Sequence, residues 1–339
     1  MASAPSNETG EAALIRAFAG KRALITGGVG FIGSILASRL VALGAEVVLL
    51  DSMFDEGGAN LANIAAIRDR VRVATCDVRD TETLAPLLDG QDYLFNLAAR
   101  TSHMGSLAEP LADLDVNCRA QLALLELARL RAPAIHIVFA GTRQIYGWPD
   151  HLPVDESHPV RPPDPNGISK MASEAYHLLY HRVHGLNSVS LRLTNTYGPR
   201  MRIKDARQNF LGVWVRRILE GQNFEVWGGA QRRDLTFVDD VVEAFLLAAS
   251  VKAAQGRAFN IGGQSLTILE LAQALVAANG GGDYTVQEFP AERRVIDIGD
   301  YEADDTLFRH VTGWAPTVEL GPGLARTLDY YRTRLPAYL

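Results

Sequence analysis

The chain has 339 residues, of which 47% are hydrophobic and 21% charged, an ordinary composition for a globular protein with a large core. Its formal net charge of −6 gives no support for binding nucleic acids or anionic membrane surfaces. The two cysteines, Cys76 and Cys118, lack the spacing of a metal site or a disulfide framework, so we expect reduced thiols in a cytoplasmic protein without a metal.

The first 20 residues lack the basic-then-apolar order of a secretion signal and carry Glu8 and Glu11. No run of about 18 apolar residues, the length that a membrane span needs, occurs in the sequence. We expect residues 1–20 to form a flexible extension that ends in a short helix over 11–18.

Residues 21–195 alternate short apolar segments with longer amphipathic ones. The apolar segments predict strands at 22–26, 46–50, 71–75, 93–96, 135–139 and 188–193. The amphipathic segments predict helices at 31–43, 81–88, 110–131 and 168–184. This alternation is typical of an α/β fold of the Rossmann type, in which helices cover both faces of a doubly wound parallel sheet.

The pattern is less regular after residue 195. It predicts helices at 208–220, 268–278, 304–311 and 323–334, a strand end running into a helix over 236–250, and a short strand at 259–262. The stretch 158–165 holds four prolines in eight residues and is predicted to be a loop.

A glycine-rich turn, Gly27-Gly28-Val29-Gly30-Phe31-Ile32-Gly33, joins the first predicted strand to the first helix. Gly27 allows the tight turn, Gly30 lets the backbone approach a diphosphate, and Gly33 lets the helix pack close to the sheet. The free N–H groups at the helix start, near Phe31 and Ile32, can then hold the negative charge. The turn therefore predicts a dinucleotide site.

Asp51 ends the second predicted strand, about 20 residues after the turn, as the ribose-binding acid of a dinucleotide site should. A carboxylate at this position accepts both ribose hydroxyls and repels a 2′-phosphate, which favours NAD over NADP. Asp77 and Val78 follow the third strand, where the adenine edge is expected to lie. Asp77 could instead be a helix N-cap.

Further segments follow the turn in a fixed order: Asn-Leu-Ala-Ala at 96–99, Thr-Arg-Gln-Ile-Tyr-Gly at 142–147, Asn-Thr-Tyr-Gly-Pro-Arg at 195–200, Arg-Asp at 233–234 with Phe-Val-Asp-Asp at 237–240, and Phe-Asn-Ile-Gly at 259–262. With the glycine turn, they resemble the extended short-chain dehydrogenase/reductases, especially the nucleotide-sugar epimerase/dehydratase branch. The similarity runs from about Lys21 to Tyr331.

The resemblance implies an NAD-binding domain over 21–195 plus 236–262 and a nucleotide-sugar-binding lobe over 196–235 and 263–339. It assigns Leu97, Ala98, Ala99, Asn117 and Lys170 to the cofactor, beside the residues of the turn. It also implies a homodimer formed through the helices 110–131 and 168–184, whose apolar positions could equally serve the internal core alone.

In enzymes of this family, a tyrosine removes the sugar hydroxyl proton while a serine or threonine hydrogen-bonds the same oxygen. Thr142 takes the place of the hydroxyl residue here. The Tyr-x-x-x-Lys element falls at residues 166–170, where Lys170 is present but Asn166 replaces the tyrosine. An amide does not titrate near neutrality, and a positioned base is worth about 10²–10⁴ in rate.

Several routes could replace the tyrosine. Tyr146 is the leading candidate base, although it could instead form a wall of the sugar pocket. Lys170 could act itself if burial lowers its pKa, and His103 lies in a loop that the resemblance places near the substrate. A water held by Asn166 and Thr142 could carry the proton, the substrate could supply a base, or the oxidation step could be lost.

Arg143 and Gln144 follow Thr142, where sugar 4,6-dehydratases carry an Asp-Glu pair and related decarboxylases usually carry Ser-Glu. Neither residue is a useful acid, so the substitution favours an epimerase or a simple oxidoreductase. Arg143 could also pair with a carboxylate on the sugar, or form a structural salt bridge.

The resemblance places further substrate contacts in the lobe. Arg233 and Arg294 match positions that hold the substrate diphosphate, Asn195 belongs to the Asn-x-Tyr-Gly-Pro element, and Asn209 and Val226 fall near positions that contact the base. We therefore predict an NAD-dependent nucleotide-sugar epimerase, acting at C4 with an altered proton route. The alternatives are a nucleotide-sugar dehydrogenase or reductase, and a binding protein without redox turnover.

Overall fold

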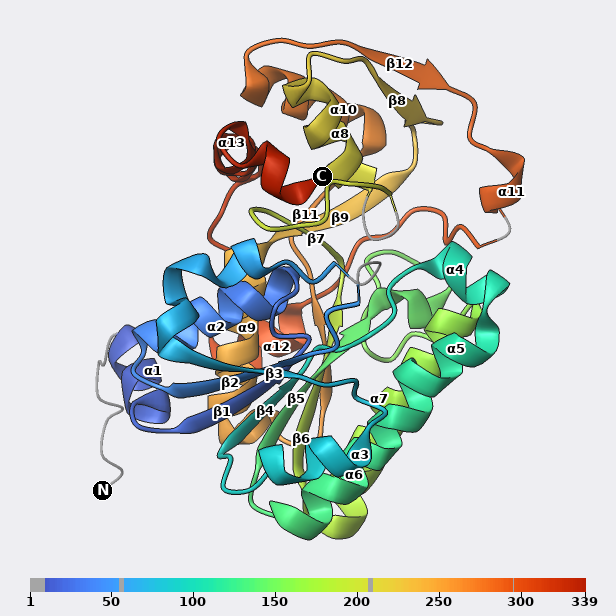
Figure 1. The fold of residues 1–339 in the computed structure, drawn as a ribbon. Helices are drawn as coiled ribbons and strands as arrows, with labels where there is room; N and C mark the ends of the chain where they lie inside the picture. Colours follow the sequence, from blue (N-terminus) through green and yellow to red (C-terminus); the bar gives the residue numbers. More distant parts are fainter. Residues whose placement is uncertain (1–9, 55–57, 207–209, 295) are drawn as a thin grey trace, which may run out of the picture.

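The centre of the molecule is a seven-stranded parallel sheet in the order β10-β6-β5-β4-β1-β2-β3 (Figure 1). The computed structural model describes residues 10–339 except 55–57, 207–209 and 295. The strands are β1 (Arg22–Thr26), β2 (Glu46–Asp51), β3 (Val71–Thr75), β4 (Tyr93–Asn96), β5 (His136–Thr142), β6 (Asn187–Leu193) and β10 (Ala258–Ile261). The strand order reverses beside β1, and such a switch point opens a crevice at the carboxyl edge of the sheet.

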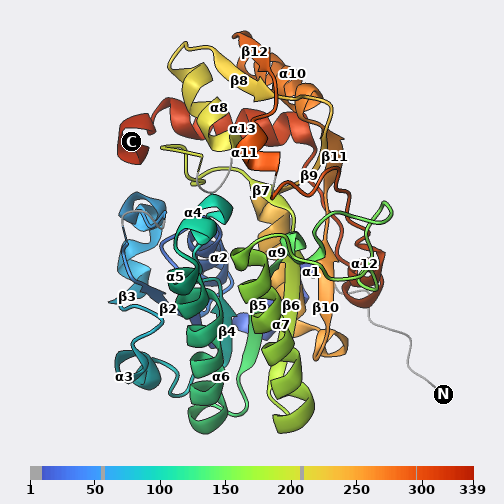
Figure 2. The same cartoon turned by 90° about the vertical axis from the view of Figure 1, so that its right-hand side faces the viewer.

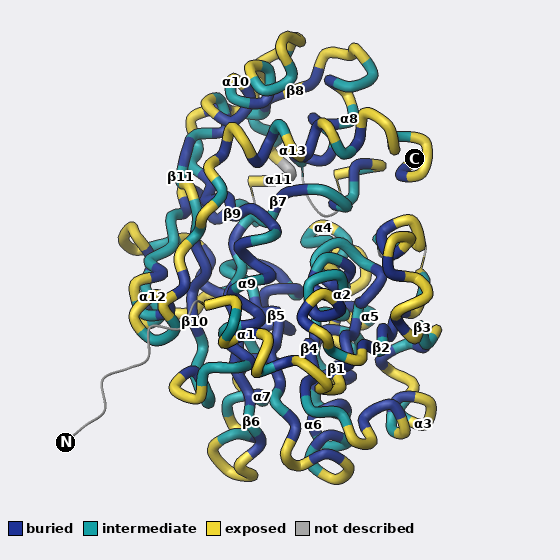
Figure 3. The backbone as a smooth tube through the Cα atoms, turned by 90° about the vertical axis from the view of Figure 1, so that its left-hand side faces the viewer, coloured by how far each residue is buried: buried dark blue, intermediate teal, exposed yellow. Residues whose placement is uncertain are grey.

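Alternate residues of each strand enter two separate cores, because successive side chains point to opposite faces of a sheet. In β1, Ala23 and Ile25 pack in one core and Leu24 packs in the other. The first face is covered by α1 (Gly10–Phe18), α2 (Phe31–Ala42), α9 (Val238–Ser250) and α12 (Thr306–Thr312), and the second by α3 (Thr81–Leu84), α6 (Ala120–Arg131) and α7 (Pro165–His184). Figure 3 shows the resulting burial of the central strands. This layered arrangement confirms the predicted α/β fold and explains the continuous apolar runs.

Local chemistry moves several element boundaries from their predicted positions. α7 begins at Pro165 rather than at 168, because the Asp164 side chain caps it by accepting a bond from Gly167 N at 2.7 Å. The predicted helix 110–131 divides into α5 (Pro110–Leu114), a π-helical turn (Asp115–Arg119) and α6. A 3-10 helix over Leu61–Arg70 and the short α4 (His103–Ala108) were not predicted.

A smaller lobe sits above the carboxyl edge of the sheet (Figure 1). It contains a three-stranded sheet of β7 (Asn195–Tyr197), β9 (Arg232–Phe237) and β11 (Gln264–Thr267), and a pair formed by β8 (Phe224–Trp227) and β12 (Tyr284–Gln287). Its helices are α8 (Phe210–Leu219), α10 (Ile268–Asn279), α11 (Ala291–Arg294) and α13 (Leu320–Arg332). The lobe has its own hydrophobic core, which includes Trp214, Leu271 and Leu324.

Two predicted domain boundaries are wrong. α12 was assigned to the lobe, but Phe308 and the following Trp314 pack in the core of the sheet domain. The extension 1–20 was predicted to be flexible, but α1 buries Leu14 and Phe18 in the same core. The predicted helix within it is confirmed at 10–18, and residues 1–9 lie outside the described part of the chain. Among the described helices, none combines the length and apolarity needed to cross a membrane.

Candidate active site

The glycine turn after β1 has the backbone geometry that a dinucleotide needs. Gly27 has a φ of +69°, and a Cβ atom there would lie 3.1 Å from Ala98 N. A Cβ atom at Gly33 would lie 2.3 Å from Gly27 O, so only glycine allows α2 to start this close to the turn. Gly30, at the N-cap, provides no capping side chain, and the first N–H groups of α2, at Phe31 and Ile32, are available to a phosphate. The turn therefore fits the diphosphate of NAD.

Asp51 stands at the carboxyl end of β2, and its carboxylate is held by the backbone. Oδ2 accepts from Val29 N and Oδ1 from Met53 N, each at 3.1 Å. Burial raises the pKa of Asp51, while these two N–H groups act against that rise. Each oxygen keeps further acceptor capacity, which suits the two ribose hydroxyls.

The residues predicted near the adenine and the diphosphate have separate roles. The Asp77 carboxylate forms an ion pair with Arg79 at 2.7 Å, and Asp80 rather than Asp77 caps α3, so the alternative role of Asp77 as an N-cap is wrong. Val78 is buried in the second core. Beyond β4, Leu97 N and Ala98 N both donate to Thr26 Oγ1 at 3.1 Å, which fixes the loop containing the partly buried Ala99.

Asn117 and Asn166 belong to one buried polar cluster around Asp113. Asn166 Nδ2 donates to Asp113 Oδ2 at 2.9 Å and to Arg100 O at 2.7 Å. Asn117 Nδ2 donates to the same two acceptors at 2.9 and 2.8 Å, and its Oδ1 accepts from Arg100 N at 3.0 Å. Both amides thus secure the loop after β4. The predictions that Asn117 contacts the cofactor directly and that Asn166 holds a catalytic water are not supported by these contacts.

Thr142 and Lys170 meet at the carboxyl end of β5. Thr142 is the last residue of the strand, and its Oγ1 accepts from Gln144 N at 3.2 Å. Lys170 reaches β5 from the first turns of α7 and donates from Nζ to Ala140 O at 2.9 Å. Burial lowers the pKa of Lys170 to about 8, and the charge of Asp113 acts against this change. The ammonium group therefore lies in a dry environment beside the expected nicotinamide position.

Tyr146, the leading candidate base from sequence, is in the wrong place for that role. Its side chain is fully buried, and its hydroxyl donates to Asn260 Oδ1 at 2.7 Å and accepts from Arg192 at 2.5 Å. Burial raises the pKa of this phenol to about 12. The short 3-10 turn after Thr142 directs the ring toward β10, and Tyr146 is not among the residues that line the cavity.

A cavity of about 610 Å³ lies between the carboxyl edge of the sheet and the lobe. The sheet domain contributes His103, Arg143 and Gln144 to its walls, and the lobe contributes aromatic and charged side chains such as Trp227 and Arg233. Thr142 directly precedes two of these wall residues. The cavity is large enough for a ligand and joins the two parts of the molecule that the sequence predicts to act together.

His103 is paired with a buried carboxylate at the edge of this cavity. Its Nδ1 lies 3.0 Å from Asp164 Oδ2, within ion-pair distance, while about a third of the imidazole is exposed. Asp164 also accepts from Gln144 Nε2 at 2.8 Å and caps α7. Burial alone would raise the pKa of Asp164, but His103 and the capping N–H hold that pKa below its ordinary value. Sequence reasoning missed Asp164, although an Asp-Pro pair before an amphipathic segment is a helix-start signal.

The predicted substrate residues divide into two groups. Arg143, Asn195 and Arg233 line the cavity. Arg233 also forms an ion pair with Asp297 at 2.6 Å. Asn209 lies outside the described residues.

The structure places the side chains of the other two predicted lobe residues away from the cavity wall. Val226 is fully buried in the core of the lobe, and its neighbours Glu225 and Trp227 line the cavity instead, because successive residues of β8 point to opposite faces. Arg294 is exposed on α11 and pairs with Glu288 at 3.2 Å, outside the cavity wall.

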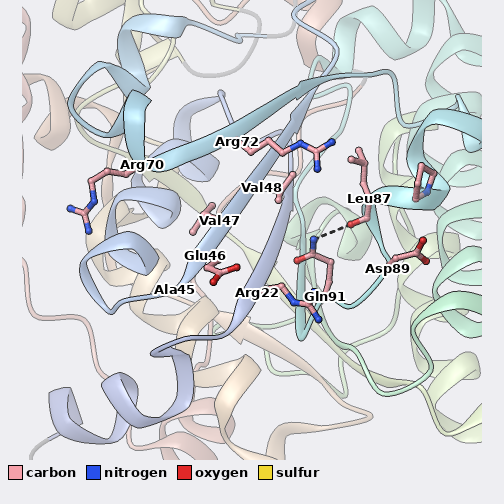
Figure 4. Close-up of a pocket in the computed structure, with 11 residues that line it drawn as sticks. Arg22, Ala45, Glu46, Val47, Val48, Arg70, Arg72, Leu87, Asp89 and Gln91 are labelled. Atoms are coloured by element: carbon pink, nitrogen blue, oxygen red, sulfur yellow. Dashed lines mark hydrogen bonds between the residues drawn. The ribbon is translucent and has the colours of Figure 1, made fainter.

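A second cavity, of about 450 Å³, lies at the opposite, amino edge of the sheet (Figure 4). Arg22 and Glu46, the first residues of β1 and β2, line it with Arg72, the second residue of β3. Gln91 Nε2 donates to Leu87 O at 3.0 Å beside them. Ligands of doubly wound sheets bind at the carboxyl edge, so this cavity is separate from the candidate active site.

Comparison with known proteins agrees with this geometry. Residues 23–262 match the NAD dependent epimerase/dehydratase family. The chain is 33% identical over 318 residues to a UDP-glucose 4-epimerase from Mycolicibacterium smegmatis, covering 92% of this chain and 99% of the relative. It is 31% identical to a dTDP-glucose 4,6-dehydratase from Streptomyces niveus, covering 92% and 93% of the two chains.

Solved structures resemble the whole molecule. The UDP-glucose 4-epimerase of Thermotoga maritima, solved with UDP-glucose, has a TM-score of 0.85 and 29% identity, and the match covers 93% of this chain and 99% of that one. The dTDP-glucose 4,6-dehydratase of Streptomyces venezuelae, solved with NAD, has a TM-score of 0.84 and 30% identity, covering 93% and 98%. The chain belongs to the NAD-dependent epimerase/dehydratase family, and its cofactor is NAD.

Proposed function

We propose that this protein is a nucleotide-sugar epimerase that inverts C4 through a transient keto sugar. The observation that supports this most directly is the cavity at the carboxyl edge of the sheet, whose walls begin at the two residues after Thr142 and continue into the lobe. A sugar in this cavity would lie between Thr142 and Lys170 on one side and the lobe on the other.

The residues of this chain divide the work of binding and chemistry. The glycine turn and Asp51 hold the diphosphate and ribose of NAD, and Lys170 lies at the nicotinamide end. Bound NAD supplies a reversible hydride acceptor. Thr142 hydrogen-bonds the reacting sugar oxygen, and Arg233 of the lobe is the contact of the substrate diphosphate, for which a planar guanidinium is well suited.

His103 is the proposed proton acceptor in place of the missing tyrosine. It lines the cavity, whereas the Tyr146 hydroxyl is bonded inside the core and the Asn166 amide faces Asp113. The buried carboxylate of Asp164 lies 3.0 Å from His103 Nδ1, the place from which a carboxylate can orient a catalytic histidine. His103 takes the hydroxyl proton as the keto group forms and returns it when the hydroxyl is restored on the other face.

A dehydratase reaction is not favoured by the residues after Thr142. Expulsion of a hydroxyl as water requires an acid beside the sugar. Gln144 is an amide that donates to Asp164, and Arg143 is a cation, so neither residue can protonate a leaving hydroxyl. Inversion at one carbon needs no second acid.

The proposal is tested by incubating NAD-loaded protein with UDP-glucose, UDP-galactose, UDP-glucuronate and UDP-N-acetylglucosamine. We expect a transient absorbance of reduced nicotinamide and a C4-inverted product detected by NMR. His103→Gln should lower kcat by about 10²–10⁴ while KM changes little, because a positioned base acts on the chemical step.

His151→Gln, which changes an exposed histidine, is the matched control and should retain full activity. Wild-type kcat in the His103 variant would reject this histidine as the base. Absence of any C4-inverted product from all four sugars would reject an epimerase of uridine-linked sugars.

A homodimer through α6 and α7 is proposed as well. The two helices run side by side on one face of the molecule (Figure 2). The α7 residues Leu179 and Val183 are exposed there, as is Leu111 of α5. Exposed apolar patches of this kind mark association surfaces. Sedimentation should show a dimer that Val183→Glu weakens, and a monomeric wild type would reject the interface.

A further inference from the structure

Arg143 carries a charge that the protein itself does not neutralise. Its NH2 group donates to Asn195 Oδ1 at 2.7 Å, and its guanidinium lies 5.1 Å from the centre of the Tyr301 ring. Its NH1 group is shielded from solvent and has no acceptor among the described residues. No carboxylate of the described chain lies within ion-pair distance of Arg143, so the predicted alternative of a structural salt bridge is not found there.

The carboxylates nearest to Arg143 each form hydrogen bonds or ion pairs with other groups. Asp297 is paired with Arg233 at 2.6 Å. Asp234 accepts from Gly263 N at 2.8 Å and from Ala303 N at 3.0 Å. Asp164 lies beside His103 and accepts a hydrogen bond from Gly167 N at the start of α7. Burial, followed by repulsion from Arg233, lowers the pKa of Arg143 to about 10, as expected of a cation that lacks a partner.

A partly buried cation with a shielded N–H group that has no acceptor is costly to the folded protein, and such groups persist where a ligand supplies the opposite charge. Arg143 lines the cavity, so that ligand would be the substrate. The substrate offers two kinds of anion to consider, the nucleotide diphosphate and a carboxylate on the sugar.

The position of Arg143 in the chain distinguishes the two anions. It directly follows Thr142, which is expected to contact the oxygen on the reacting C4. In a pyranose ring, C1 with its diphosphate lies across the ring from C4, whereas C5 and the group it carries are next to C4. The backbone of Arg143 therefore starts at the C4 end of the sugar, where the C5 substituent is the nearest group that can carry an anion.

We infer that Arg143 binds the C5 carboxylate of a uronic acid, and that the preferred substrate is a nucleoside-diphosphate hexuronate. This inference rests on the proposed C4 epimerase. A planar guanidinium matches a carboxylate with two parallel hydrogen bonds, which a neutral C5 hydroxymethyl group cannot replace. Asn195 holds the guanidinium in position from the first residue of β7.

The test compares UDP-glucuronate with UDP-glucose on the NAD-loaded protein. Because both carry the same nucleotide, the ratio of their constants does not depend on which base the enzyme prefers. Wild type should favour UDP-glucuronate by roughly 100-fold in Kd and in kcat/KM, the size expected of charge-assisted hydrogen bonds in a closed site. Arg143→Met should reduce that preference to less than about tenfold without weakening UDP-glucose.

Two further variants separate the roles of charge and shape. Arg143→Lys keeps the charge without the planar fork and should recover only part of the preference. Arg217→Met removes an exposed arginine from the α8 wall of the same cavity and should leave the uronate preference intact. Removing a partly buried cation that has no carboxylate partner should not destabilise the fold, so Arg143→Met should unfold near the wild-type temperature.

Equal constants for the two sugars in wild type would overturn the inference and leave the epimerase standing. Equal weakening of both sugars by Arg143→Met would also overturn it, because it would place the guanidinium on the diphosphate. If neither sugar is epimerised, the proposed function fails for uridine nucleotides, and the Kd ratio alone still decides where Arg143 binds.

Discussion

Replacing Asn166 by leucine tests the structural role assigned to this residue, because leucine is close in volume but has no amide. The change removes one hydrogen bond to the buried carboxylate of Asp113 and one to the carbonyl of Arg100. A bond to a charged group contributes about 1.5–3 kcal/mol and a neutral one about 0.5–1.5 kcal/mol. Both acceptors keep a hydrogen bond from Asn117, so neither acceptor loses its last partner. We expect the free energy of unfolding to fall by roughly 2–4 kcal/mol.

Urea unfolding followed by tryptophan fluorescence measures this change, since Trp314 is buried in the sheet domain. Asn223→Leu, at an exposed asparagine, is the control and should alter stability by less than about 0.5 kcal/mol. In an Asp113→Leu background, the cost of Asn166→Leu should shrink by about 1 kcal/mol or more, because the shared partner is gone. Wild-type stability in Asn166→Leu, together with no coupling to position 113, would refute the structural assignment.

The remaining predictions concern the cofactor turn, the excluded tyrosine and the buried lysine. Gly33→Ala places a Cβ atom 2.3 Å from Gly27 O, so calorimetry should show at least about a 100-fold loss of NAD affinity in a folded protein; unchanged affinity would contradict the turn geometry. Tyr146→Phe removes the buried hydrogen bonds of the phenol with Asn260 Oδ1 and with Arg192, which keeps its ion pair with Glu174. It should cost about 1–3 kcal/mol in urea unfolding while kcat stays within about threefold; a collapse of kcat at full stability would restore Tyr146 as the base. In the cofactor-free protein, the pKa of Lys170 is about 8, below its ordinary value of 10.5, so the unfolded chain binds more protons between these values. Wild type should therefore gain up to about 3 kcal/mol of stability relative to Lys170→Met as the pH rises through that window, and a flat difference would show that the lysine is not desolvated.

The parts of the fold that sequence reasoning predicted well are those set by local pattern. The strands of the parallel sheet bury both faces, so their apolar runs are visible without any knowledge of the fold. The glycine turn and Asp51 were also predictable, because each role depends on a spacing of about 20 residues or less within one strand–helix–strand unit. Lys170 reaches the end of β5 from α7, 30 residues away in sequence, so its place beside Thr142 came from the resemblance and not from a local spacing.

The failures concern side-chain direction and contacts between distant segments. Tyr146 follows Thr142 by four residues, but the intervening 3-10 turn sends its ring toward Asn260, more than 100 residues away in sequence. Val226 and Trp227 differ only in which face of β8 they occupy, and a resemblance near position 226 cannot fix that register. The return of α12 to the sheet domain is equally invisible locally, because its helical pattern does not say which core it joins.

Asn166 illustrates how a substitution at one position depends on its surroundings. Read from sequence, it is the loss of a catalytic tyrosine. In the structure, Asn166 and Asn117 both donate hydrogen bonds to Asp113 and to the carbonyl of Arg100. Residue 166, where relatives carry the tyrosine base, therefore fixes the loop that leads to His103. The same helix start supplies Asp164, whose carboxylate lies 3.0 Å from His103 Nδ1, so the sequence around the missing tyrosine also contacts its proposed replacement.

Retention of a label at the reacting carbon tests the central claim most directly. A UDP-sugar deuterated at C4 is incubated with NAD-loaded protein in ordinary water, and the product is examined by NMR. The account predicts a C4-inverted sugar that keeps its deuterium at C4, because the deuterium passes as hydride to bound NAD, which does not exchange it with water, and returns to the same carbon. Inversion with loss of deuterium to the solvent, or recovery of the sugar with no inversion, would contradict it.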